Sequence, residues 1–228
     1  MAILRRAKKG PKTYWLGKRV AEVPDFIPAS VRGGSKRITE IGEPVLHTKA
    51  HPVTQFGTPD LAELIDDMFS TMDIAEGVGL AAPQIGVDRQ IFVYDVPDDN
   101  GDRHLGYIIN PELTVLDDTP LPREEGCLSV PGGGAELERA SKVEVKGFDY
   151  KGHPLTLTAE GYLARAFQHE YDHLQGTLYY DHLSPDDQTS VLAERDEQRD
   201  TVLSRRKEVA EQFGKPHPDY PPSPAGGR

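Results

Sequence analysis

The chain has 228 residues, of which 37% are hydrophobic and 28% charged, and its formal net charge is -11. This length is sufficient for one domain with a buried core and additional segments at its ends. No apolar run approaches the roughly 18 residues that a membrane-spanning helix needs, and no secretory signal is apparent behind the basic start. Cys127 is the single cysteine, which excludes an intrachain disulfide and favours a reducing cytoplasm.

Charge is distributed unevenly along the chain. Residues 1–37 carry ten Lys and Arg residues against two acidic residues, whereas the remainder is acidic. The acidic body argues against recognition of a specific nucleic-acid sequence. We interpret residues 1–37 as a basic, partly disordered extension; a contact with RNA or an acidic surface and an organelle transit peptide are the alternatives. Residues 214–228 are rich in Pro and Gly, which predicts a disordered or extended tail.

A helix is predicted after Thr58, a favourable N-cap residue that is followed by Pro59 at the first helical position. Apolar residues then recur at helical spacing as far as Met72, and the helix is expected to end near Gly77. Strands are predicted downstream, together with a hairpin whose turn lies at 149–152. The predicted strands are 91–96, 106–110 and 113–116, with Pro111 separating the last two, and then 142–146 and 155–157.

Two further helices are predicted near the end of the chain. Residues 160–174 have helical periodicity and stop at Gly176, a favourable C′ residue. Residues 184–213 form a charged helix whose apolar positions are sparse, so only part of its length is expected to pack on the domain. Strands followed by helices indicate an α+β domain with a mostly antiparallel sheet.

The sharpest chemical signal is His169-Glu170-Tyr171-Asp172-His173. On a helix the two histidines share one face, so their imidazoles can bind one metal ion while Glu170 lies close to it. A carboxylate in that position can take a proton from water activated by the ion. A surface pair of histidines beside a solvated glutamate is the alternative.

A third ligand is required, and Cys127 is one candidate. It lies in Glu125-Gly126-Cys127-Leu128-Ser129, and a metal ion binds the thiolate form of cysteine. Asp181 and His182 downstream are further candidates. One cysteine with two histidines leaves a fourth position open for water, as in catalytic sites. A lone cysteine on its own is more often a small core residue.

The segment Gly77-Val78-Gly79-Leu80-Ala81-Ala82-Pro83-Gln84 is rich in small residues. It favours the close approach of another backbone, and the amide of Gln84 could stabilise a developing oxyanion. A structural tight turn is the alternative for this segment.

Together these three motifs, in this order and spacing, resemble the signature motifs of the peptide deformylases. The resemblance runs from about Ile38 to about Leu183. It implies α+β architecture with antiparallel β-sheets packed around a central metal-binding helix, and a C-terminal helix. The expected organisation is a basic extension (1–37), a catalytic domain (38–183), a charged helix (184–213) and a Pro/Gly-rich tail (214–228).

The resemblance also implies an activity, which is removal of the formyl group from N-formylmethionine on nascent polypeptides, with release of formate. Metal-bound hydroxide would attack the formyl carbon, with Glu170 as general acid/base. The implied cofactor is Fe²⁺, with zinc or nickel able to substitute, although ligand chemistry alone would favour zinc. The implied site residues are Cys127, His169 and His173 as metal ligands, Gln84 and the Leu128 N–H as oxyanion donors, and Val78, Gly79 and Gly126 beside the substrate backbone.

Phe167, Leu128 and Tyr162 are candidates for the methionine pocket. Arg165 lies one turn before His169, where an apolar residue would suit that pocket better, so we expect it to point aside and pair with an acid. Glu125 and Arg139 are expected to pair and hold the cysteine loop.

We expect a cytoplasmic monomer that contacts the ribosome transiently and no membrane. A peptidase of the His-Glu-x-x-His type and a catalytically silent docking module for peptides or the ribosome are the competing hypotheses. The retention of all three ligands, Glu170 and Gln84 speaks against the silent module.

Overall fold

The computed structural model describes residues 11–21 and 23–222. It contains strands (β), α-helices (α) and short 3₁₀ helices (η). In chain order these are β1 (Thr13–Trp15), β2 (Lys18–Val20), α1 (Pro28–Arg32), η1 (Pro44–His47), α2 (Pro59–Ile74), β3 (Gly79–Ala81), η2 (Ala82–Ile85), β4 (Ile91–Pro97), β5 (Arg103–Cys127), β6 (Val130–Phe148), β7 (Pro154–Glu160), α3 (Gly161–Gln175), η3 (Tyr179–His182) and α4 (Pro185–Gln212).

The seven strands form one sheet in the order β2-β1-β5-β4-β3, and β6 and β7 continue from β5. Only β1 and β5 pair in parallel; every other pair of neighbours is antiparallel. The predicted α+β class with a mostly antiparallel sheet is therefore confirmed. Because β3 is the last strand in its direction, one of its edges pairs with no other described strand.

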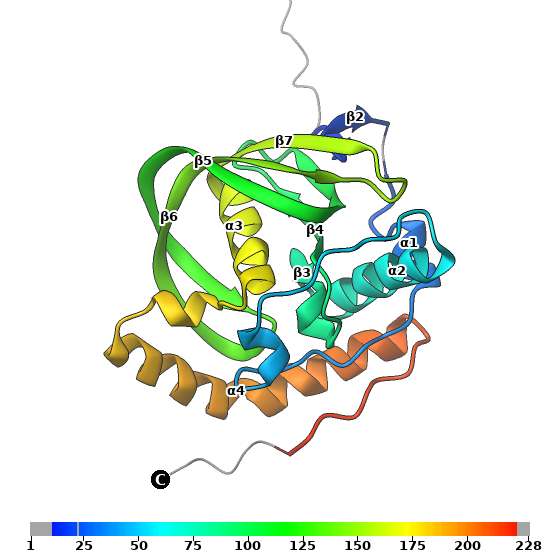
Figure 1. Ribbon diagram of the computed structural model, residues 1–228. Coiled ribbons are helices and arrows are strands. Elements are labelled where there is room, and N and C mark those ends of the chain that lie inside the picture. Colours follow the sequence, from blue (N-terminus) through cyan, green and yellow to red (C-terminus); the bar gives the residue numbers. More distant parts are fainter. Residues whose placement is uncertain (1–10, 22, 223–228) are drawn as a thin grey trace, which may run out of the picture.

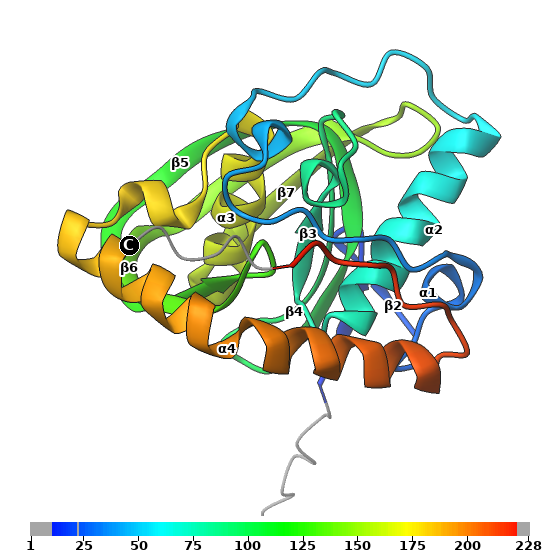
Figure 2. The same ribbon diagram turned by 90° about the horizontal axis from the view of Figure 1, so that it is seen from below.

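The sheet curves around α3, which lies in the middle of the molecule (Figure 1). Helix α2 lies to one side of it, and α4 runs across one end of the curved sheet against β6 (Figure 2). One apolar cluster fills the space between α2 and the sheet. A second cluster joins α3 to the strands that surround it. The central helix is thus buried on most of its circumference, as the resemblance implies.

Local sequence signals account for the ends of the predicted helices. The Thr58 hydroxyl accepts a hydrogen bond from the Leu61 N–H at 3.2 Å at the start of α2. That helix ends at Ile74, slightly earlier than expected. Helix α3 stops at Gly176, whose φ of 78° lies in the left-handed region that glycine adopts readily. Helix α4 begins after Ser184 as predicted.

The strands around Pro111 differ from the prediction. Residues 106–110 and 113–116 belong to one strand, β5, which pairs with β6 through several register shifts. The irregularity at Pro111 is a bulge, and Asn110 has a φ of 50° there. The Asn110 side chain donates to the Val53 carbonyl and accepts from the Val53 N–H, both at 2.8 Å. These bonds hold Asn110 to the segment before α2, and β5 continues beyond the bulge.

The end segments lie against the domain wherever the structure describes them. Strand β1 joins the sheet beside β5, and α1 packs on α2. Residues 214–222 are extended, but they are held by contacts, since the Tyr220 hydroxyl accepts from the Ile38 N–H at 3.1 Å. This part of the predicted disordered or extended tail is therefore an irregular segment that contacts the domain. The expected disorder of residues 1–10 and 223–228 lies outside the described residues.

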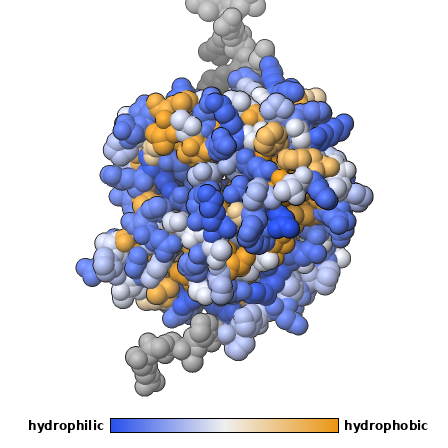
Figure 3. Space-filling model, in the orientation of Figure 1, coloured by the Kyte–Doolittle hydropathy of each residue, from blue (hydrophilic) through white to orange (hydrophobic). Residues whose placement is uncertain are grey.

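The surface in Figure 3 is largely hydrophilic, with small apolar groups scattered between charged residues. Among the described residues, no helix combines the length and the apolar character that a membrane crossing requires.

Candidate active site

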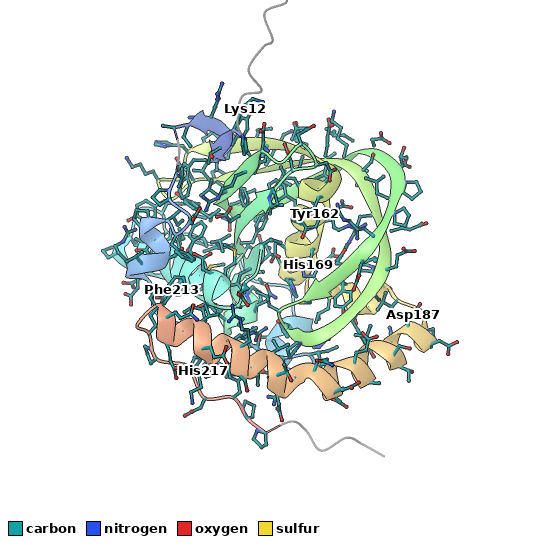
Figure 4. The ribbon with its side chains drawn as sticks, turned by 180° about the vertical axis from the view of Figure 1, so that it is seen from behind. Lys12, Tyr162, His169, Asp187, Phe213 and His217 are labelled. Carbon is teal, nitrogen blue, oxygen red and sulfur yellow. The ribbon has the colours of Figure 1, made fainter. Side chains whose placement is uncertain are left out.

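The candidate site lies where α3, the turn between β5 and β6, and the segment of β3 and η2 meet. His169 and His173 lie on one face of α3, and Cys127 is the last residue of β5. Gln84 lies in η2, directly after the edge strand β3. Figure 4 shows His169 and Tyr162 on α3, which the β5–β6 hairpin surrounds while α4 crosses nearby.

The three predicted ligands converge on one point. One donor atom each from Cys127, His169 and His173 lies within 4.8 Å of the other two, and all three side chains are buried. The Cys127 Sγ is 3.2 Å from the His173 Nε2. A thiolate and two imidazoles at this spacing fit a transition-metal ion or zinc, because soft sulfur and imidazole donors select such ions over magnesium or calcium. The residues present therefore fit a metal ion.

Glu125 fixes the orientation of the first histidine. Its carboxylate lies 2.7 Å from the His169 Nδ1, which leaves Nε2 free as the donor atom. The same carboxylate accepts from Arg139 at 2.7 Å and from Arg165 at 2.7 Å. Burial alone would raise the pKa of Glu125, but the hydrogen bonds from His169 and Arg139 hold that pKa well below its usual range. The expected Glu125–Arg139 pair and the acidic partner of Arg165 are both found.

The second histidine has a different environment. His173 is fully buried, and burial together with the neighbouring His169 lowers its pKa well below the usual value. A neutral imidazole is the form that binds a metal ion, so this environment favours the ligand state.

Two further groups direct hydrogen bonds toward the cysteine sulfur. The Ser129 N–H donates to the Cys127 Sγ at 3.3 Å, and the Gln84 Nε2 lies 3.5 Å from it. The Gln84 Oε1 accepts from the Ala81 N–H at 2.8 Å, which fixes which end of the amide faces the sulfur. The amide donor predicted for Gln84 therefore points into the site.

Glu170 is buried next to the ligands, and its Oε2 has no hydrogen-bond partner among the described residues. Burial raises the pKa of Glu170 to about 7. The negative charges of Glu125 and Asp172 also raise this pKa, whereas the charge of His169 lowers it. A nearby cation would oppose this shift. A Cβ at Gly79 would collide with the Glu170 carboxylate, so any larger residue there would displace the Glu170 side chain from the site. The small residues of this segment make room for a side chain as well as for a backbone.

A cavity of about 480 Å³ opens onto these groups. Of the nine predicted site residues, all except the deeper-lying His173 line it: Val78, Gly79, Gln84, Gly126, Cys127, Leu128, His169 and Glu170. Leu128 and Tyr162, two candidates for a methionine pocket, also border this space. Phe167 does not; its ring packs on Tyr94 and Phe92 at centroid distances of 4.9 and 5.7 Å in the core. The prediction for Phe167 is therefore wrong.

The downstream ligand candidates are engaged elsewhere. The Asp181 carboxylate accepts from the Leu178 N–H at 2.8 Å, and the His182 Nε2 lies 3.0 Å from the Asp172 carboxylate. Neither belongs to the group of donors around Cys127.

Among the cavity residues that were not predicted, two come from α4. Val202 and Arg206 line the cavity, and the Arg206 Nη2 donates to the Leu128 carbonyl at 2.9 Å. The signal that could have found them is a helical face shared by buried residues at 191, 195, 199, 206 and 209. Arginines occupy three of these positions, so the face does not read as apolar.

Comparisons with known proteins agree with this geometry. A model of the polypeptide deformylase family matches residues 35–189. Peptide deformylase 1 of Streptomyces avermitilis is 49% identical over 167 residues, which cover 71% of this chain and 76% of the relative. A peptide deformylase of Halothermothrix orenii is 51% identical over 145 residues, covering 64% of this chain and 91% of the relative.

A crystal structure of a peptide deformylase from Legionella pneumophila superposes with a TM-score of 0.67 at 41% identity, covering 74% of this chain and 97% of the other. The fold and the site thus define a metal-dependent hydrolase. The chain belongs to the peptide deformylase family, whose activity is deformylation of nascent polypeptides.

Proposed function

We propose that Cys127, His169 and His173 hold the metal ion of this deformylase and that Glu170 is its general acid/base. The observation that carries the proposal is the convergence of three buried donors and a buried carboxylate on one cavity. By the resemblance of the motifs, the proposed ion is Fe²⁺, which zinc or nickel could replace. A bound ion supplies Lewis-acid activation of water and of the formyl carbonyl.

Glu170 manages the proton of the reaction. It takes a proton as water attacks the formyl carbon, and it returns that proton to the methionine nitrogen as the C–N bond breaks. Formate and a free amine are the products. Its burial supports this role, because a carboxyl with a pKa near neutral can both accept and donate a proton.

Gln84 and the Leu128 N–H are the proposed donors to the oxygen that becomes negative in the transition state. The Gln84 amide is already oriented by the Ala81 N–H, so it needs no reorganisation during the reaction. Leu128 directly follows Cys127 in the tight turn between β5 and β6, which places its backbone beside the sulfur.

The substrate backbone is proposed to bind at the free edge of β3. Val78, Gly79 and Gly126 all line the cavity, and β3 has one edge that pairs with no other described strand. An extended peptide could add to this edge as another strand, with its methionine side chain beside Leu128 and Tyr162.

We further propose that the protein works as a cytoplasmic monomer that meets its substrate at the ribosome, where formylated N-termini emerge. Residues 38–183 are the proposed catalytic domain. The basic segment 1–37 supplies the positive charge that suits transient contact with RNA, whereas the segment 184–213 is net acidic.

Formate release tests the proposed function. The protein is purified anaerobically with its metal content measured, and it is given formyl-Met-Ala-Ser, acetyl-Met-Ala-Ser and unblocked Met-Ala-Ser. We expect formate from the first peptide and no cleavage of peptide bonds in any of them. Cleavage of peptide bonds would support the peptidase hypothesis instead. No formate from a sample with about one metal ion per chain would contradict the proposal.

A further inference from the structure

The peptide unit between Leu128 and Ser129 is held from both sides. Its N–H, from Ser129, donates to the Cys127 Sγ at 3.3 Å. Its carbonyl, from Leu128, accepts from the Arg206 Nη2 at 2.9 Å. One peptide unit therefore connects a cation on α4 with the sulfur that is proposed to bind the metal ion.

Arg206 is unusual among the arginines of α4. Its side chain is only 3% exposed, and it forms no ion pair within residues 11–21 and 23–222. Arg199 is equally buried but forms two hydrogen bonds of 2.7 Å to Glu40. Exposed Arg205 pairs with Glu76 at 2.7 Å. The Leu128 carbonyl is thus the one described hydrogen-bond acceptor of a buried charge.

The geometry of the peptide unit aligns its dipole between the two groups. In a trans peptide the C=O and N–H bonds point in opposite directions, so the oxygen faces the guanidinium while the N–H faces the sulfur. A cation at the oxygen increases the polarity of the N–H, and hydrogen bonds in such a chain strengthen one another in a low-dielectric interior. The Ser129 N–H consequently withdraws more negative charge from the sulfur.

We propose that Arg206 is a positioning residue for the deformylase reaction, acting through the Leu128–Ser129 peptide to reduce electron donation by the Cys127 thiolate. This inference rests on the proposed role of Cys127 as a metal ligand. A less donating thiolate leaves the bound ion a stronger Lewis acid. The C-terminal helix is then part of the catalytic unit, because it supplies the charge.

The test uses the full-length protein loaded with Co²⁺, whose thiolate charge-transfer absorption reports electron donation by the sulfur. Arg206→Gln removes the charge but keeps an N–H donor, Arg206→Met removes both, and Arg206→Lys restores the charge. Arg205→Gln is the matched control, since it removes one positive charge from the adjacent position without touching Leu128. Thermal melting identifies which variants are folded.

We expect the charge-transfer band to move to longer wavelength in Arg206→Gln and further in Arg206→Met, and to return toward the parent position in Arg206→Lys. Formate release should fall roughly tenfold in Arg206→Gln, with the loss in kcat rather than in KM. Arg205→Gln should match the parent protein in both measurements.

An unmoved band in a folded Arg206→Gln sample would overturn the inference, as would a loss confined to KM, which would indicate direct contact with substrate. The ligand role of Cys127 has a separate test. If the parent protein takes up Co²⁺ but shows no thiolate charge-transfer band, or if Cys127→Ser leaves that band in place, the ligand role of Cys127 is contradicted instead. The parent protein loaded with ¹¹³Cd²⁺ gives a reading that needs no variant. A scalar coupling between the ion and the Ser129 amide proton would show the N–H···Sγ bond through which Arg206 is proposed to act, and its absence in a folded, loaded sample would overturn the inference.

Discussion

Helices α3 and α4 approach the same cavity in different ways. Helix α3 buries ten of its 15 residues inside the sheet, whereas α4 buries six of its 28, and three of those six are arginines. Two polar groups of α3 at the site, Arg165 and His169, are joined through one carboxylate, Glu125. Two buried arginines of α4, Arg199 and Arg206, contact separate partners on the rest of the protein, namely the buried Glu40 carboxylate and the Leu128 carbonyl. A helix whose sequence suggests that it is solvent-exposed can therefore contact an active site through buried arginine side chains.

Small residues on β6 permit this arrangement. A Cβ at Gly132 would collide with the Gln198 side chain, and one at Gly133 would lie 2.8 Å from the Val191 carbonyl oxygen. Gly132 also has a φ of 92°. The glycine run after the cysteine motif thus provides a surface on which α4 packs closely, so its role here is close approach of the helix.

The largest effect should come from breaking the network around Glu125. Glu125→Gln removes the charge that compensates two buried arginines, so we expect the free energy of unfolding to fall by about 3–5 kcal/mol. Metal affinity should fall roughly 10–100-fold, because His169 loses its partner. Urea unfolding and competition with a chelator measure these changes. Glu138→Gln is the control, because Glu138 is the exposed residue before Arg139. Equal losses of stability and metal affinity in Glu125→Gln and Glu138→Gln would contradict the account.

The same comparison can be made within α4. Arg199→Met leaves the buried Glu40 carboxylate without its partner, and we expect it to cost about 3 kcal/mol in urea unfolding. Arg205→Met removes an exposed pair and should change stability little. Similar small changes in both variants would show that burial of the Arg199 pair has no energetic weight.

The partly buried carboxylate of Asp73, at the end of α2, also has a pKa shift opposite to that of Glu125. Burial raises the pKa of Asp73 to about 6, with Asp95 adding to the effect, and Lys215 from the segment after α4 opposes it. The folded protein therefore favours the protonated form of Asp73. The resulting contribution to the free energy of unfolding is complete below the ordinary pKa of an aspartate, and it is lost as the pH rises through about 6.

Asp73→Asn cannot ionise and should therefore be more stable than the parent protein at pH 8, by about 2 kcal/mol. At pH 4 the difference should largely disappear. Urea unfolding at the two pH values measures it, with exposed Glu63→Gln on the same helix as the control. A stability difference that does not change with pH would contradict the raised pKa.

The smallest predicted effect concerns how the two helices begin. The Ser184 hydroxyl accepts from the Asp187 N–H at 3.2 Å at the start of α4, whereas Glu160 makes no side-chain cap on α3. Ser184→Ala should lower the free energy of unfolding by about 1 kcal/mol. Glu160→Ala should have little effect, because packing inside the sheet holds α3. Melting temperatures of the two variants measure these effects. A larger decrease for Glu160→Ala than for Ser184→Ala would contradict the prediction.

Sequence patterns predicted the elements whose signals are local. The Thr58 cap, the β4 strand and the two histidines on α3 all follow from residues close together in the chain. The bulge at Pro111 was missed because it depends on partners far away in the sequence: β6 pairs with β5 on both sides of it, and Val53 binds the Asn110 side chain.

The site shows the same division between local and tertiary information. The motifs identified the donors around Cys127, and the Glu125–Arg139 pair was expected from charge. Phe167 was misplaced because its position on α3 faces the aromatic core instead of the cavity. Arg206 was missed because a buried arginine and an exposed one look alike in a single sequence.

The division of roles between metal binding and proton transfer is tested most directly by Glu170→Gln. Its metal content and its formate release from formyl-Met-Ala-Ser are measured on one anaerobic sample beside the parent protein. We expect about one ion per chain, because Glu170 is outside the group of three donors, and a rate roughly 1,000-fold lower. A fully loaded Glu170→Gln protein that releases formate at the parent rate would contradict the account.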